Sequence, residues 1–236
     1  ILAGSSIIAL TVYTGKKQAW LADYRTTYAE QKSIQLEDGT HITLNSKTAI
    51  DVNYTAHDRE IILRFGEIYV ETGKDNAKRP FKILDQHGEM LALGTAFNVQ
   101  QQKDQTLLIV TEHAVQVTTQ QSKQQQTIQA GQQIGFDTQQ IYPTQPIQLE
   151  QLTWRNGLVT VNRMSLQDFA QIIEKNFWIH VVIDPNLFAT LPETIEISGS
   201  YPMNNLARLI VLLENTYPVQ IETSFFGQKI TISKKN

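Results

Sequence analysis

From residue 33 to residue 141, apolar and polar residues alternate along the chain in short runs. A period of two is typical of strands that bury one face, and the glycines, prolines and Asp-Gly pairs between the runs indicate turns. No amphipathic helix of ordinary length fits this stretch. The pattern predicts a many-stranded β sandwich or solenoid-like unit, with strands over residues 33–36, 41–44, 49–54, 59–64, 67–71, 81–84, 88–93, 96–101, 105–110, 113–118, 124–130 and 133–136.

The period changes after residues 143–153, a stretch with two prolines and no periodicity. Ser165 and Asp168 have the spacing of a helix-capping signal, and apolar residues then recur at helical spacing as far as Phe177. A second amphipathic stretch carries Leu206, Leu209, Ile210 and Leu213. Short apolar runs occupy residues 157–161, 179–183, 194–198, 219–223 and 229–233. This order predicts a small β-α-β-β-α-β-β unit.

Before the alternating region, residues 1–15 are apolar and uncharged. A membrane span needs about 20 apolar residues, so we expect a truncated transmembrane segment; a signal-peptide remnant and an ordinary buried strand or helix are the alternatives. Residues 16–32 are expected to be a linker, in which Trp20, Tyr24 and Tyr28 have a spacing that allows a short helix. We therefore predict a mainly β fold, with an all-β domain at 33–142, a linker at 143–153 and a C-terminal α+β domain at 154–236.

Composition removes several classes of function. The formal net charge is -3 and no run of Lys and Arg stands out, which argues against nucleic-acid binding. The chain has no cysteine, so thiolate chemistry and disulfides are excluded. None of the five histidines has metal-ligand spacing, and no nucleophile or phosphate-loop motif is present. We predict no catalytic residue, no metal and no cofactor, and we do not expect an enzyme.

Three glycine-containing pairs have a structural interpretation. Asp38 and Gly39 are expected to close a hairpin between neighbouring strands, because both tolerate turn geometry. Gly94 is expected to bend the chain before the strand at 96–101. Gly66 and Glu67 could suggest a carboxylate mechanism, since carboxylates distant in sequence can converge. The simpler interpretation is a turn glycine followed by the first residue of a strand.

Several short blocks stand in a definite order along the chain: Leu36 to Asn45, Arg59 to Val70, Arg79 to Phe81, Leu93 to Val99, Ala130 to Gln132 and Trp154 to Leu166. In this order they resemble the FecR family of inner-membrane signal transducers. The C-terminal pattern resembles the short domain that precedes secretins and TonB-dependent transporters. One departure is Glu112-His113-Ala114, where the family usually has Glu-Gly before the next strand.

The resemblance implies a receiver on the periplasmic side of the inner membrane, single-pass in its full length and anchored by the N-terminal segment. It implies an anti-sigma regulator whose C-terminal domain docks the periplasmic signalling domain of an outer-membrane, siderophore-type TonB-dependent transporter. Docking would expose the chain to regulated proteolysis and signal to a cytoplasmic sigma factor, through a region missing from this chain. The alternatives are a periplasmic carbohydrate- or peptidoglycan-binding β module, suggested by Trp154 and Tyr201, and a hydrolase.

Docking is expected on an exposed strand edge, because unpaired N–H and C=O groups bind an added strand without special side chains. The run ending at Tyr201-Pro202 alternates as an edge strand should, and the terminal hairpin at 219–233 is the other candidate. An interior position for this strand is the alternative. The predicted partner-binding residues are Thr194, Ile195, Glu196, Ile197, Ser198 and Tyr201.

Trp154 is the predicted interdomain residue, because it follows the proline-containing linker and a buried Trp can anchor one unit on another. Packing within its own domain is the alternative. If Trp154 joins the units, Trp154→Ala should raise protease sensitivity between residues 143 and 157.

Overall fold

The computed structural model describes residues 21–187, 195–224 and 226–235. Over these residues the chain divides into two compact units. The first unit contains the stretch up to residue 27 and residues 31–147, and the second contains residues 28–30 and the chain from residue 148. The predicted transmembrane segment at 1–15 lies outside the described residues. Within the described ranges, every helix is too short or too polar to span a membrane.

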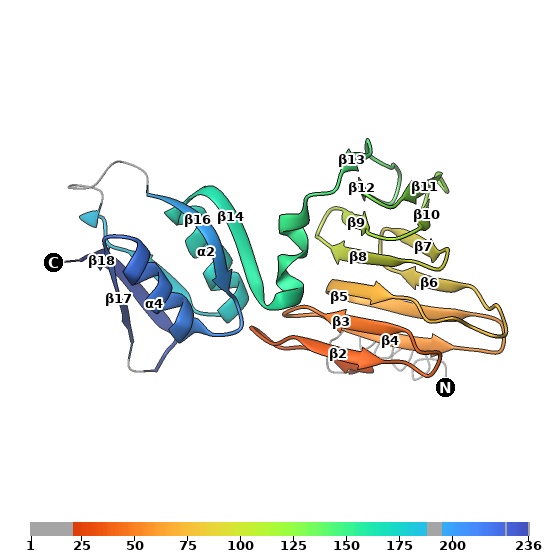
Figure 1. Cartoon of the computed structure of the whole chain (residues 1–236), viewed down its shortest axis with the longest axis horizontal. Coiled ribbons are helices and arrows are strands. Elements are labelled where there is room, and N and C mark those ends of the chain that lie inside the picture. Colours follow the sequence, from red (N-terminus) through yellow and green to blue (C-terminus); the bar gives the residue numbers. More distant parts are fainter. Residues whose placement is uncertain (1–20, 188–194, 225, 236) are drawn as a thin grey trace, which may run out of the picture. The chain divides into compact units, whose positions relative to one another are not determined.

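The elements of the first unit in the described part of the chain are β-strands, which lie side by side in Figure 1. Its strands join one 13-stranded sheet, in which β5 and β6 are parallel and the other pairs are antiparallel. The strands are β1 (Tyr24–Arg25), β2 (Lys32–Gln35), β3 (His41–Leu44), β4 (Ala49–Tyr54), β5 (Arg59–Glu71), β6 (Phe81–Leu84), β7 (Gly88–Ala92), β8 (Ala96–Gln101), β9 (Thr106–Val110), β10 (Ala114–Thr119), β11 (Gln125–Gln129), β12 (Gln132–Phe136) and β13 (Gln145–Pro146).

These strands agree closely with the predicted ones, with two differences near the ends of the unit. Tyr24 pairs with Ile50, so β1 is a strand inside the stretch where a linker or short helix was expected. Strand β13, at Gln145–Pro146, was not predicted; it pairs with β12 within a stretch expected to be a linker.

Strand β5 organises the sheet. Its first half pairs with β4 and β6, and its second half pairs with β3 and β8. Two separate strands with a turn at Gly66 were predicted, and this is wrong: β5 runs unbroken for 13 residues. Gly66 has φ 97°, and a Cβ there would overlap the backbone of Thr48. The glycine therefore lets the strand change partners without ending.

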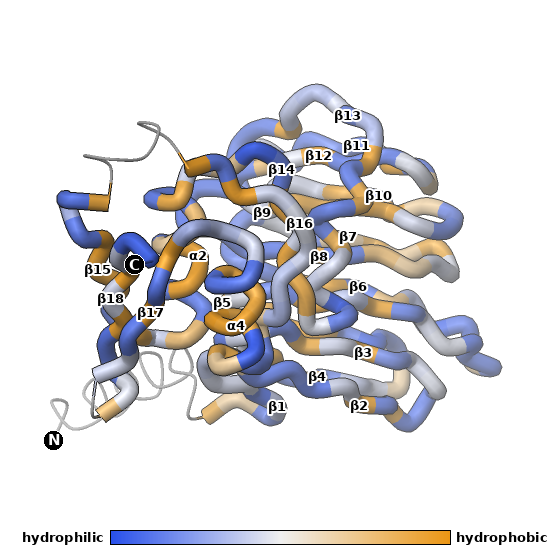
Figure 2. Tube along the Cα trace, turned by 60° about the vertical axis from the view of Figure 1, so that its left-hand side comes forward, coloured by the Kyte–Doolittle hydropathy of each residue, from blue (hydrophilic) through white to orange (hydrophobic). Residues whose placement is uncertain are grey.

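The core of the first unit is built from the inward positions of strands in both halves of the sheet. Figure 2 shows apolar and polar positions alternating along the strands. Alternation along the predicted strands also places Phe65 inside, but it is only half-buried, because the β4–β5 register shifts between Ala49 and Ile50 beside it. The other residues that the alternation places inside are buried as expected: Leu36, Leu44, Leu63, Phe81, Phe97 and Val99.

The second unit has the predicted order of strands and helices. A two-stranded sheet, β14-β16, and a three-stranded sheet, β15-β18-β17, enclose one apolar core together with helices α2 and α4. The 3₁₀ helix η2 begins within the predicted linker. The elements are η2 (Leu149–Asn156), β14 (Leu158–Ser165), α2 (Leu166–Phe177), β15 (His180–Ile183), β16 (Glu196–Pro202), α4 (Leu206–Thr216), β17 (Val219–Thr223) and β18 (Lys229–Lys234).

Helices α2 and α4 each begin with a side-chain cap. Ser165 accepts a hydrogen bond from the backbone N–H of Asp168, which confirms the predicted start of α2, and Asn205 accepts one from Arg208 at the start of α4. Such caps satisfy backbone donors that the first helical turn leaves unpaired. The two caps are forty residues apart, as are the leucines that follow them. The unit is therefore an internal repeat of strand, helix and strand.

Candidate partner-docking edge

Strand β16 has one unpaired edge, because among the described residues it pairs with β14 alone. The carbonyl of Ile195 accepts from the Leu166 N–H at 3.0 Å, and the N–H of Met203 donates to the Gly157 carbonyl at 2.8 Å. Backbone groups alternate in direction along a strand. The backbone N–H and C=O groups of Glu196, Ser198 and Ser200 therefore face away from β14. We call this the β16 edge.

The structure describes all the predicted docking residues except Thr194, which lies outside the described residues. Ile195, Ile197 and Tyr201 are buried, and Glu196 and Ser198 are exposed, so the expected alternation is observed. A partner would therefore meet the outward backbone and the polar side chains, since the apolar ones belong to the core. Binding at these residues stays a prediction.

The exposed face beside this edge is fixed by polar contacts with β14. The guanidinium of Arg163 pairs with the carboxylate of Glu196 at 2.8 Å and lowers the pKa of Glu196. Arg163 has φ 52° at a bulge in β14, where its N–H donates to the Ser198 hydroxyl at 2.9 Å. The hydroxyls of Thr160 and Ser200 are 2.8 Å apart. These contacts fasten the β16 backbone to β14, its partner strand among the described residues.

Two tyrosine hydroxyls lie against the middle of the β16 edge. The N–H of Ser198 donates to the hydroxyl oxygen of Tyr217 at 2.8 Å. The hydroxyl of Tyr201 donates to the Ser198 carbonyl at 2.9 Å and lies 3.2 Å from that of Tyr217. Burial, followed by the contact with Tyr217, raises the pKa of Tyr201. The Tyr201 phenol is therefore a neutral partner for this backbone.

On each outer strand of the three-stranded sheet, a glutamate carboxylate accepts a hydrogen bond from an outward-facing backbone N–H. The Val181 N–H on β15 donates to Glu174 Oε1 at 2.7 Å, and the Ile221 N–H on β17 donates to Glu214 Oε1 at 2.7 Å. Each carboxylate lies on a helix, seven residues before the N–H that it accepts. Hydrogen bonds to a charged acceptor are short and strong, so both edges are closed to an added strand at these points.

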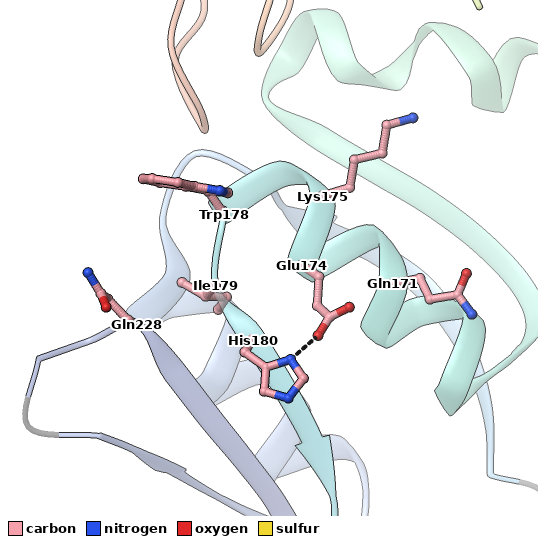
Figure 3. A pocket seen from close by; sticks show the side chains of 7 residues that line it. All are labelled: Gln171, Glu174, Lys175, Trp178, Ile179, His180 and Gln228. Carbon is pink, nitrogen blue, oxygen red and sulfur yellow. Dashed lines mark hydrogen bonds and ion pairs between the residues drawn. The ribbon is translucent and has the colours of Figure 1, made fainter. Parts of the chain in front are cut away.

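An open pocket lies beside Glu174 (Figure 3). The His180 Nδ1 is 2.9 Å from Glu174 Oε1, and the Trp178 side chain is 73% exposed. Trp178 has φ 54°, and its ring stacks with that of Tyr28 at a centroid distance of 5.4 Å. No group of acidic residues and histidines suited to a metal ion is found among the described residues. The pocket is lined by Gln171, Glu174, Lys175, Trp178, Ile179, His180 and Gln228.

The aromatic residues that suggested glycan binding do not form a binding face. Trp154 is 9% exposed within η2, and Tyr201 is 4% exposed in the core, where its ring packs on Phe169 at 4.9 Å. A sugar-stacking platform needs an exposed aromatic face, so these two residues do not support the glycan-binding alternative. The proposed role of Trp154 in joining the units stays a prediction.

The first unit buries its polar motif residues in the interior. The expected Asp38-Gly39 hairpin joins β2 and β3, and the carboxylate of Asp38 also pairs with the Arg59 guanidinium at 2.6 Å. Burial alone would raise the pKa of Asp38, but hydrogen bonds from Thr40 and Arg59 hold it below its usual range. The sequence motif around Asp38 therefore stabilises the fold.

Glu67 was expected to begin a strand, and this is wrong. It lies inside β5, buried, where its carboxylate accepts hydrogen bonds from the side-chain amides of Asn45 at 2.8 Å and Asn98 at 2.9 Å. Amides from β8 and from the end of β3 thus satisfy this buried charge. A carboxylate enclosed in this way fastens strands together and offers no open acid–base site.

A second buried polar cluster joins the turn before β7 to β9. The hydroxyl of Thr106 lies 2.9 Å from the Nδ1 of His87 and donates to the carboxylate of Asp85. Burial raises the pKa of Asp85. The side chains of Thr106 and His87 are buried, so the hydroxyl bonds within the protein. This cluster explains why His87 occupies an interior position.

Sequence reasoning missed Tyr217, Glu174 and Glu214. The available signal was the internal repeat: Glu174 and Glu214 occupy matching positions forty residues apart, and Phe177 matches Tyr217 in the same way. Periodicity identified the helices but not the duplication. Without the duplication, these residues look like ordinary polar and aromatic residues near a helix end.

Residues 22–116 match the family described as FecR protein. These residues form a FecR-like domain. The expected resemblance is confirmed over these residues, which include the Asp38–Arg59 pair and strand β5. The FecR domain accounts for most of the first unit, and the second unit lies outside the matched region.

Two crystal structures have the same fold as the chain. Both are of a candidate anti-sigma factor from Parabacteroides distasonis, at 1.65 Å and 2.50 Å resolution. Each has a TM-score of 0.63 and 19% sequence identity, and covers 90% of this chain and 98–99% of the other. At this identity the likeness shows the fold. Among curated proteins, none matches the chain.

Proposed function

We propose that this chain is the receiving part of a FecR-like signal transducer that regulates a sigma factor. The observation that carries the proposal is the FecR domain at residues 22–116. The likeness of fold to a candidate anti-sigma factor supports it, because that likeness extends over 90% of the chain. The role is regulatory, and we propose no catalysis.

The finer proposal concerns where the chain acts and with what. It is a periplasmic receiver of an inner-membrane protein, anchored through the N-terminal segment, and it relays the signal to a cytoplasmic sigma factor. Its second unit docks the periplasmic signalling domain of an outer-membrane, siderophore-type TonB-dependent transporter, and docking leads to regulated proteolysis. The unpaired β16 edge supports this docking, because an added strand is a common way to join small mixed domains.

The experiment is a titration of the chain with purified periplasmic signalling domains of TonB-dependent transporters, followed by calorimetry. Glu196→Pro removes an N–H from the β16 edge, and its ring also obstructs an added strand. Its matched control is Glu196→Ala, which keeps the N–H and removes the carboxylate that pairs with Arg163.

The expected result is a loss of affinity of about tenfold or more for Glu196→Pro and little change for Glu196→Ala. Circular dichroism should show that both variants retain their β content. Full affinity of a folded Glu196→Pro variant would exclude docking on this edge. Failure of every signalling domain to bind the unaltered chain would overturn the proposed partner.

A further inference from the structure

The Tyr217 hydroxyl occupies a place that an added strand would need. The Ser198 N–H points outward from the unpaired β16 edge, and the Tyr217 oxygen accepts it at 2.8 Å. That distance is within the normal range for backbone ladder bonds. The hydroxyl is also 3.3 Å from the Ser198 carbonyl. It therefore lies where the backbone of a neighbouring strand would exchange both hydrogen bonds with Ser198.

The first repeat shows that packing does not require this hydroxyl. Phe177 is the residue that matches Tyr217, at the end of α2 as Tyr217 follows the end of α4. A phenyl ring thus suits this position in the repeated architecture. The hydroxyl is the difference between the two, and its contacts go to Ser198 and to the hydroxyl of Tyr201.

The hydrogen bond that covers the β16 edge is also weaker than those that cover the edges of β15 and β17. There the acceptors are the carboxylates of Glu174 and Glu214, at 2.7 Å from their backbone donors. A charged acceptor forms a hydrogen bond roughly twice as strong as a neutral one. Of these three described edges, the one closed by a neutral phenol opens at the lowest cost.

We propose that the Tyr217 hydroxyl is a displaceable latch on the β16 edge. The latch keeps the Ser198 N–H paired while the chain is alone, which hinders pairing with a second copy or with an unrelated strand. A docking strand replaces it: a carbonyl of the partner accepts the Ser198 N–H, and an N–H of the partner donates to the Ser198 carbonyl. The proposal rests on the proposed function, in that the β16 edge is the docking site.

Displacement leaves no buried group unpaired. The Tyr217 hydroxyl already lies 3.2 Å from that of Tyr201, which can accept from it after the ring moves. The Tyr201 hydroxyl can keep its bond to the Ser198 carbonyl, since a carbonyl oxygen accepts two hydrogen bonds. The partner is therefore an extended segment whose backbone pairs at Glu196, Ser198 and Ser200. Pro202 has no N–H and limits the pairing at that end.

The test compares Tyr217→Phe with the unaltered chain in two measurements. Hydrogen exchange of the Ser198 amide reports the latch without any partner, and calorimetry with the signalling domain that binds the unaltered chain reports docking. Tyr217→Phe keeps the ring and removes the hydroxyl. Tyr201→Phe is the matched control, because it removes a neighbouring hydroxyl while leaving the acceptor of the Ser198 N–H in place.

We expect the Ser198 amide to exchange faster in Tyr217→Phe and as slowly as before in Tyr201→Phe. We expect Tyr217→Phe to bind the signalling domain about fivefold more tightly, the value of one net hydrogen bond that no longer has to be broken. The thermal midpoint of each variant, measured alongside, shows whether it is folded under the conditions of the titration.

Two results separate this inference from the docking proposal. If Glu196→Pro weakens binding but Tyr217→Phe does not strengthen it, the β16 edge is the docking site and the latch is wrong. If Glu196→Pro binds with full affinity, docking lies elsewhere and both proposals fail. An unchanged exchange rate of the Ser198 amide in Tyr217→Phe overturns the latch whatever the partner does.

Discussion

The two units use polar side chains in opposite places. In the first unit they lie in the interior: Asp38 and Arg59 form an ion pair whose side chains are 1% and 8% exposed, and Glu67 is enclosed by amides. In the second unit the core cluster is apolar, and Glu174, Glu214 and Tyr217 reach instead to strand edges. These polar side chains hold the interior of the first unit together, whereas in the second unit they cover the edges of the sheets.

This difference indicates which substitutions should unfold the protein and which should change what it binds. An interior ion pair leaves a buried charge unpaired when one partner is lost. A side chain at a strand edge leaves an N–H that water or another strand can satisfy. The first unit should therefore be sensitive to loss of a charge, and the second unit should respond to loss of an acceptor with smaller losses of stability.

The largest expected effect is in the first unit. Asp38→Ala leaves the buried Arg59 guanidinium without its carboxylate, so the free energy of unfolding should fall by about 3–5 kcal/mol. Urea denaturation followed by circular dichroism measures this. Asp58→Ala is the control, because its pair with Lys82 is longer, at 3.3 Å, and more exposed, and its effect should be much smaller. Equal effects of the two changes would contradict the contrast between interior and surface charge.

The second unit should show a moderate effect at the β17 edge. Glu214→Ala removes the acceptor of the Ile221 N–H, which should lower the free energy of unfolding by about 1–2 kcal/mol. Hydrogen exchange of the Ile221 amide should accelerate in the same variant. Glu214→Gln keeps an acceptor oxygen and should recover part of the loss. An Ile221 amide that stays protected in Glu214→Ala would show that the carboxylate is not what closes this edge.

A smaller effect, in the opposite direction, is expected at the turn before β10. His113 has φ 49°, a conformation that glycine adopts more readily and that the family usually fills with glycine. His113→Gly should therefore raise the free energy of unfolding by about 0.5–1 kcal/mol. Glu112→Gly, one residue earlier, is the control and should stabilise nothing. A lower thermal midpoint for His113→Gly would mean that the imidazole makes a contact worth more than the backbone strain.

The smallest expected effect is the pH dependence of an exposed carboxylate in the first unit. Backbone N–H groups of Gln139 and Gln140 and the Tyr142 hydroxyl donate to Asp137, and lower its pKa to about 2. Because the folded pKa is below the unfolded one, this stabilisation is present above about pH 4 and is lost as pH falls toward 2. The difference in thermal midpoint between the unaltered chain and Asp137→Ala should shrink over that window. A difference that stays constant from pH 5 to pH 2 would contradict the hydrogen-bonding argument.

Sequence reasoning located the elements well and the connections between them less well. Strands β3, β4, β6 and β8 have the predicted bounds, because alternation and turn residues are local signals. Gly66 was misread, because a glycine in a bulge and a glycine in a turn look alike along the chain; the approach of Thr48 across the sheet distinguishes them. Tyr24 and Tyr28 have helical spacing, but pairing of β1 with β4 overrides that local preference.

The features of the candidate site also fall into those that the sequence predicts and those that only the fold reveals. The sequence by itself determined that the run from Ile195 to Tyr201 alternates between inside and outside, and that a proline ends the strand, because both follow from a period of two and from the missing N–H of proline. Only the tertiary structure decided that β16 pairs on one side alone and that the Tyr217 hydroxyl covers its Ser198 N–H. An edge and its cover are relations between segments distant along the chain, and no local pattern of residues encodes which segment comes to lie beside which.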